Sequence, residues 1–143
     1  MTPEELDSQT VTLNGVTFLH KDIRVVVDLF YSRVQEDALL KIPFASVHDW
    51  PEHVRRLTHF WWIKFGGTPY QFTHYNPVPK HYHAGFNETL LQRWLGLFQQ
   101  TLNECLTAEQ ADLWTIISNR MGHALSMKNE LYGQSLKGSS EEG

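Results

Sequence analysis

DWPEHVRRLTHFWWIKF, residues 49–65, is the most informative part of this chain, because it predicts a long helix with a well-marked start. Asp49 can cap the first turn, and Glu52 stands three residues further on, where a capping box places its acceptor. Pro51 is tolerated at this point, since the amides of a first turn have no partners within the helix. The motif therefore predicts a helix that begins next to Asp49.

One side of this predicted helix is apolar and carries a histidine. Steps of three and four residues place His53 in line with Leu57 and Trp61. An inward imidazole needs a partner, and the ordinary one is a backbone carbonyl in a core. Whether His53 has a more specific role depends on the rest of the chain.

Size and charge limit the classes of protein to consider. The chain has 143 residues and no long linker of Pro, Gly or Ser, which predicts one domain with one core. Twelve Lys and Arg stand against sixteen Asp and Glu, a net charge of −4, and the longest basic run is Arg55–Arg56. Binding to the phosphate backbone of a nucleic acid is therefore not expected.

The chain also shows no sign of membrane insertion or export. No apolar run reaches the roughly 20 residues that cross a bilayer, and MTPEELDSQ, residues 1–9, does not resemble a leader peptide. The single cysteine, Cys105, cannot form an internal disulfide, which suits a reducing, cytoplasmic location. The chain is unusually rich in histidine and aromatic residues, with eight His, eight Phe, five Tyr and five Trp. This composition suggests that the protein binds a metal or a large flat hydrophobic group.

The periodicity predicts an all-α domain with four main helices. They are expected over residues 21–36, 49–65, 87–106 and 107–132. Asn14 and Gly15 predict a hairpin turn within an N-terminal extension over residues 1–19. The domain itself is expected over residues 20–133, followed by a flexible tail over residues 134–143.

Three interpretations compete for the histidines. A haem would need a second histidine opposite His53, and His74, His81 and His83 are candidates. The same three histidines could instead form a zinc or other transition-metal site, although no cysteine or acidic pair completes it. The third interpretation is a helical interaction module without a cofactor, in which the aromatics only fill the core.

Several short motifs, in the correct order, resemble the truncated globins of group III. The resemblance covers roughly residues 20–132. The segments that carry it are FYSRVQEDALLKIPF (30–44), DWPEHVRRLTHFW (49–61), NPVPKH (76–81) and LLQRWLGLF (90–98). The resemblance implies a two-over-two helical sandwich around a haem b group.

The resemblance also implies a role for each matched residue. His81 would be the proximal iron ligand, although His83, two residues later, leaves that assignment open. The polar residues of the distal side, where a ligand is stabilised, would be Tyr31, His53 and Trp94. The residues in contact with the cofactor would be Phe44, Leu57, Phe60, Trp61, His81 and Trp94.

These residues predict the chemistry of a haem protein that binds oxygen and other diatomic ligands. Oxygen gains partial negative charge at ferrous iron, and Tyr31 and Trp94 each offer a hydrogen-bond donor, while His53 either gates entry or transiently coordinates the iron. Two such bonds would slow release, which argues against oxygen transport by easy delivery and for trapping, sensing or redox turnover. Nitric oxide dioxygenation or peroxidase-type activity would need an external reductase, because the chain carries no flavin or nicotinamide motif.

Overall fold

The computed structural model describes residues 1–71 and 87–124, and its helices follow the predicted ones closely. The elements are α1 (Pro3–Asp7), β1 (Thr10–Leu13), β2 (Val16–Leu19), α2 (His20–Glu36), α3 (Trp50–Lys64), α5 (Glu88–Cys105) and a last helix over residues 108–124. The all-α prediction is confirmed. The four main helices begin within one residue of their predicted starts.

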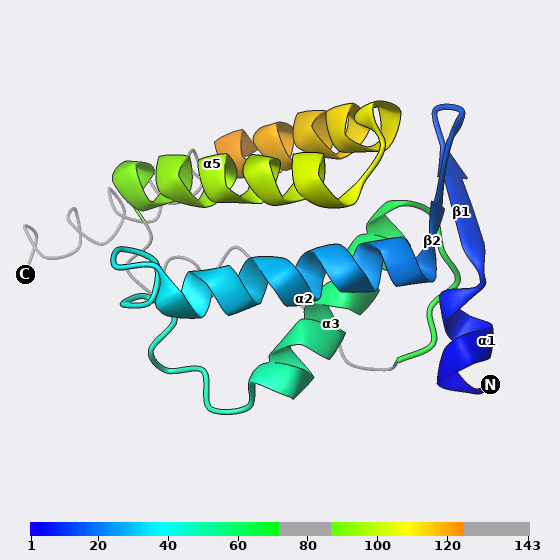
Figure 1. The fold of residues 1–143 in the computed structure, drawn as a ribbon, viewed down its shortest axis with the longest axis horizontal. Helices are drawn as coiled ribbons and strands as arrows, with labels where there is room; N and C mark the ends of the chain where they lie inside the picture. Colours follow the sequence, from blue (N-terminus) through cyan, green and yellow to red (C-terminus); the bar gives the residue numbers. More distant parts are fainter. Residues whose placement is uncertain (72–86, 125–143) are drawn as a thin grey trace, which may run out of the picture.

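The helices form two crossed layers. In Figure 1, α5 and the last helix lie side by side above α2, and α3 crosses on the other side of α2. Helix α2 contacts both α3 and α5, so it connects the two layers. Its predicted apolar stripe is buried along its whole length: Ile23, Val26, Val27, Phe30, Tyr31 and Val34.

The N-terminal extension packs on the domain as a short helix and a hairpin. The hairpin turn places Asn14 at φ 51° and Gly15 at φ 78°, the left-handed pair that a tight two-residue hairpin requires. Phe18 of β2 is fully buried, stacks on Phe65 with ring centroids 4.7 Å apart, and meets Trp114 edge-on at 6.0 Å. Burial of this ring attaches the extension to the helical core.

Side-chain caps mark the starts of the helices, with one correction to the prediction. The Asp49 carboxylate accepts the Glu52 backbone N–H at 3.1 Å, as predicted. The expected capping box at Asp49 is wrong, however, because Glu52 receives hydrogen bonds from both Arg55 and Arg56 instead. These two arginines lie one turn further along the helix, where opposite charges attract the carboxylate away from the helix start.

The other two predicted caps are confirmed. Asn87 accepts the Leu90 N–H at 2.9 Å. Thr107 and Gln110 form a complete capping box, with hydrogen bonds of 3.1 and 3.3 Å in the two directions.

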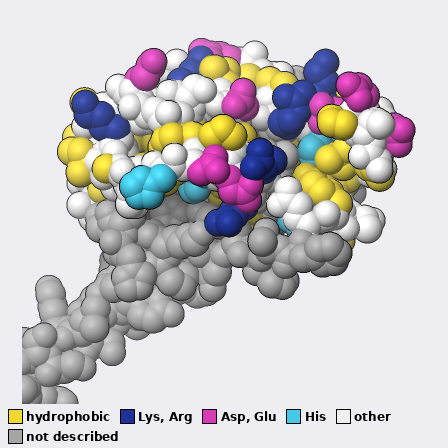
Figure 2. All heavy atoms as spheres, turned by 90° about the horizontal axis from the view of Figure 1, so that it is seen from below, with side chains coloured by type: hydrophobic (Ala, Val, Ile, Leu, Met, Phe, Trp, Pro, Cys, Tyr) yellow, Lys and Arg dark blue, Asp and Glu magenta, His cyan; other side chains and the backbone are white. Residues whose placement is uncertain are grey.

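The surface shows no strong bias of charge on the face drawn in Figure 2. Basic and acidic side chains are interspersed there with scattered hydrophobic ones. Among the described residues, no helix has the length and hydrophobicity needed to cross a membrane.

Candidate functional site

Three of the predicted site residues meet in one aromatic cluster between α2, the segment after it, and the start of α3. Tyr31 contacts His53 edge-on, with ring centroids 5.2 Å apart, and contacts Phe44 at 5.9 Å. Phe44 and His53 are 6.2 Å apart. Residues separated by 22 positions in the chain, Tyr31 and His53, therefore lie in direct contact.

Trp50 also belongs to this cluster, although the sequence analysis did not select it. Its ring lies 5.4 Å from that of His53, 6.1 Å from Tyr31 and 6.3 Å from Phe44. One signal for Trp50 was available in the sequence. It directly follows the N-cap residue, and an aromatic residue in the first turn of a helix can pack beneath the start of that helix. Trp50 therefore contacts all three of the other rings in the cluster.

Trp94 approaches the same region from α5. Its indole stacks on Phe98 with centroids 4.9 Å apart and planes 11° apart, and it meets Phe30 edge-on at 5.2 Å. Phe30 in turn contacts Tyr31 at 4.8 Å. The indole Nε1 is buried and has no hydrogen-bond acceptor within the described part of the chain.

The remaining predicted contacts of α3 lie one to three turns after its start. Leu57 and Trp61 are both 3% exposed. Trp61 stacks on Phe98 at 5.8 Å, and half-buried Phe60 lies edge-on to Trp61 at 5.4 Å. Trp61 and Trp94 therefore pack on the same phenylalanine ring.

The predicted iron ligand lies outside the described residues. This holds for His81, for its alternative His83, and for His74, which was considered for a zinc site. Over residues 1–71 and 87–124, no group of three His, Cys, Asp or Glu side chains could hold a metal ion.

Comparison with protein families decides the class. The family model of the bacterial-like globins matches residues 18–127, most of the chain. The chain belongs to the bacterial-like globin family. The matched region of this globin begins at Phe18, so it includes only the second half of β2.

A solved structure supports the fold assignment. The globin is similar to the group III truncated hemoglobin from Campylobacter jejuni, with a TM-score of 0.68 and 22% sequence identity. The similarity covers 76% of this chain and 89% of that one. None of the curated proteins matches the chain. The predicted truncated-globin fold is thereby confirmed.

Membership of the globin family implies haem binding, and the residues present fit such a group. A porphyrin is a large flat hydrophobic surface. The hydrophobic core offers the rings of Phe44 and Trp61 and the apolar side chain of Leu57 for contact with such a surface. A buried indole N–H without an acceptor costs about 1–3 kcal/mol. Trp94 carries such an N–H, so a polar partner from outside the described residues would stabilise it.

Two buried histidines form hydrogen bonds to the segment after α3. Neither was predicted as a site residue. His59, 4% exposed, accepts the backbone N–H groups of Tyr70 and Gln71 at its Nε2, at 3.1 and 3.2 Å. His20, 3% exposed, lies three residues before Ile23 on the apolar stripe of α2, which was an available signal. His59 lies off the predicted stripe of its helix, and no pattern identified it.

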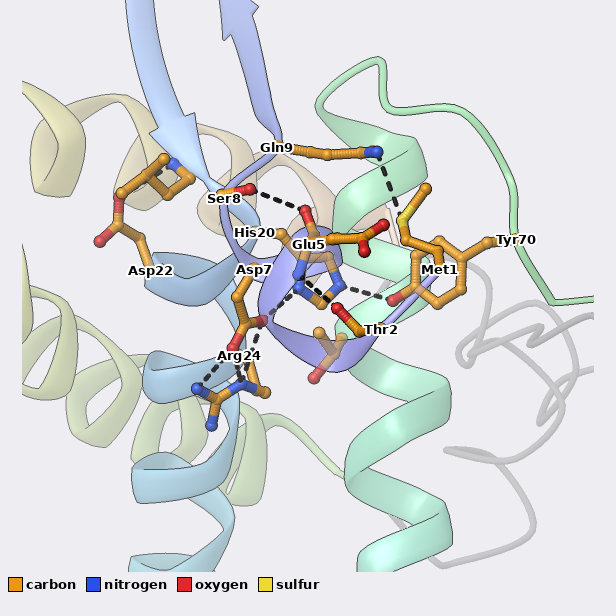
Figure 3. Close-up of polar contacts among 12 residues, drawn as sticks. Met1, Thr2, Glu5, Asp7, Ser8, Gln9, His20, Asp22, Arg24 and Tyr70 are labelled. Carbon is orange, nitrogen blue, oxygen red and sulfur yellow. Dashed lines mark hydrogen bonds and ion pairs between the residues drawn. The ribbon is translucent and has the colours of Figure 1, made fainter.

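His20 connects three elements through its two ring nitrogens, as Figure 3 shows. Nδ1 lies 2.9 Å from the Asp7 carboxylate of α1, and Nε2 lies 2.6 Å from the hydroxyl of Tyr70. Arg24 donates to both oxygens of Asp7 at 2.8–3.2 Å. Burial tends to raise the pKa of Asp7, but the hydrogen bonds from Arg24 and His20 outweigh it and lower that pKa below its ordinary value.

This ion pair should make the stability of the globin depend on acid pH. Because the pKa of Asp7 is lowered in the folded state, its stabilisation is present above about pH 4 and is lost as the pH falls through the lowered value. We expect Arg24→Gln to reduce the free energy of unfolding by about 1 kcal/mol at neutral pH. Urea unfolding of both proteins at several pH values measures the difference. A difference that stays constant into strong acid would contradict the ionic origin.

Proposed function

We propose that this globin binds haem b, with His81 as the proximal iron ligand, and holds oxygen or another diatomic ligand on the opposite side. Bound haem would supply an iron atom with one open coordination position. Tyr31, His53 and Trp94 would form the polar lining of that side. Phe44, Leu57, Phe60 and Trp61 would contact the porphyrin.

The observation that carries this proposal is the indole Nε1 of Trp94. It is buried and lacks an acceptor among the described residues, while its ring is held by stacking on Phe98 and by the edge of Phe30. A donor fixed in position without an acceptor is suited to a ligand that carries partial negative charge. Tyr31 would add a second donor from α2, and His53 would control entry beside it.

Strong donors favour retention of the ligand over rapid delivery. The globin would therefore trap or sense a diatomic ligand, or use it in nitric oxide dioxygenation or peroxidase-type turnover. Either reaction needs electrons, which we assign to an external reductase. Burial raises the pKa of the half-buried Cys105 thiol, which would then stay protonated, as suits a reducing cytoplasm.

Titration of the purified protein with hemin tests the proposal directly. We expect a haem absorption spectrum that saturates at one equivalent. A folded protein that stays colourless would overturn the proposal.

Two matched variants test the ligand. We expect His81→Ala to weaken haem binding by about 10²-fold, because it removes the iron–imidazole bond, and His83→Ala to have little effect. The affinity is measured by transfer of haem to a competing acceptor protein. The reverse order of effects would assign the iron to His83.

A further inference from the structure

A cavity of about 580 Å³ lies away from the predicted porphyrin contacts, between α1, α2, α3 and the segment that ends at Tyr70. Leu6, Trp50 and Val54 give it an apolar wall, and half-buried Tyr70 lies at its edge. Its lining carries groups of both signs: the carboxylates of Asp7 and Asp28, the guanidinium groups of Arg24 and Arg55, and Met1 with its terminal amine. The volume of the cavity and its apolar wall suit a small aromatic molecule.

Tyr70 at the edge of this cavity has a proton acceptor already in place. The Asp7 carboxylate can only accept, so the tautomer of His20 that fits both contacts carries its hydrogen on Nδ1 and presents Nε2 as an acceptor to the Tyr70 hydroxyl at 2.6 Å. Figure 3 shows the three side chains in line, with Arg24 behind Asp7. In that tautomer the phenol donates to Nε2, and the Asp7 carboxylate lies where it would pair with an imidazolium.

This arrangement matches what the one-electron oxidation of a tyrosine needs. Removal of an electron makes a phenol strongly acidic, so the reaction is favourable only if the proton can leave at the same time. Burial, with the charge of Asp7, raises the pKa of Tyr70 to about 12, so the phenol keeps its proton until it is oxidised. His20 can accept that proton, and Asp7 then pairs with the resulting imidazolium.

We propose that Tyr70 is a redox-active residue that passes electrons from a small phenol in this cavity to the haem site during peroxide reduction. This inference rests on the proposed function. Tyr70 loses one electron, and its phenolic proton moves to Nε2 of His20. A phenol in the cavity then gives one electron to the tyrosyl radical, Nε2 of His20 returns its proton to Tyr70, and the phenol releases its own proton to solvent and becomes a phenoxyl radical. Two such rounds supply two electrons, which together with two protons from solvent convert one hydrogen peroxide into two water molecules.

Aromatic side chains connect Tyr70 with the predicted haem site. The ring of His20 lies 5.4 Å from Tyr70 and 5.1 Å from Trp62, which directly follows Trp61 on α3. On the other side, Trp50 both lines the cavity and contacts His53. The first route has ring-to-ring steps of 5.4 and 5.1 Å from Tyr70 as far as Trp62.

The first experiment locates the radical. Haem-loaded protein is treated with hydrogen peroxide and a nitroso spin trap, digested, and mapped by mass spectrometry. We expect adducts on Tyr70, and we expect Tyr70→Phe to lose them together with most of the oxidation of added phenols. Peroxide consumption without any adduct on Tyr70 would overturn the proposal.

The second experiment tests the proton acceptor and needs no haem. A photo-oxidised ruthenium complex removes an electron from the protein, and transient absorption follows the tyrosyl radical. We expect His20→Gln to slow oxidation of Tyr70 by about 10²-fold, as for loss of a positioned base, and the exposed control His123→Gln to leave it unchanged. We also expect slower oxidation of the unsubstituted protein in D₂O.

Equal rates in His20→Gln and the unsubstituted protein would overturn the role of His20. The two experiments also separate this proposal from the proposed function. A failed hemin titration would count against haem binding, whereas the ruthenium experiment tests the Tyr70–His20 pair alone.

Discussion

The double variant Tyr31→Phe, Trp94→Phe is expected to release oxygen about 10²–10⁴-fold faster than the unsubstituted globin. Each residue offers one hydrogen bond to a ligand with partial negative charge, worth about 1.5–3 kcal/mol. Phenylalanine keeps a ring in each position but removes the donor. The rate is measured by stopped-flow displacement of oxygen, and each single variant should account for about 10–10²-fold.

Carbon monoxide provides the control for this prediction. It acquires much less negative charge than oxygen, so its dissociation rate should respond only weakly to the loss of the donors. Equal acceleration for both gases would mean that the substitutions act through packing. An unaltered oxygen rate would remove Tyr31 and Trp94 from ligand stabilisation.

The second large effect is expected at Phe98, where Phe98→Ala should reduce the free energy of unfolding by about 3–5 kcal/mol. The side chain is 1% exposed and contacts four other rings, those of Phe30, Trp61, Trp94 and Trp114. A loss of this size is a large part of the roughly 5–15 kcal/mol that stabilises a domain. Thermal unfolding should move down by roughly 10–20 °C.

The neighbouring residue Gln99 supplies a matched control. It lies exposed on the same helix, so Gln99→Ala should change the stability by less than about 0.5 kcal/mol. Because Trp94 stacks on Phe98, the Trp94 ring should also lose its fixed position in the Phe98 variant. We expect its near-ultraviolet circular dichroism to weaken even at low temperature, where the protein stays folded. Equal stability of the two variants would contradict the central position of Phe98.

Both predictions connect the core with the site. Phe98 supports Trp94 on one side and Trp61 on the other, so the residues expected to face the porphyrin rest on a ring that is itself part of the core. Phe30, on the apolar stripe of α2, supports Tyr31 in a similar way, because its ring contacts both Tyr31 and Trp94. Core packing would therefore set the position of the donors.

The contacts among Tyr31, Phe44 and His53 could be predicted because these residues follow regular patterns. His53 and Leu57 share a helix face, and the motifs that carry Tyr31, Phe44 and Trp94 occur in the order of the globin family. The structure places Tyr31, Phe44 and His53 in contact, as expected. Their roles toward a haem stay predictions, as does the assignment of the iron to His81.

The helices, most of their caps and their apolar faces could be predicted from local patterns, because these depend on residues within a few positions of one another. Which distant polar groups meet could be seen only in the folded chain. His20 and Tyr70 are fifty positions apart, and Asp7 comes from an extension whose packing no local pattern specified. Such partners are chosen by how the layers pack and by the cost of leaving buried polar atoms without hydrogen bonds.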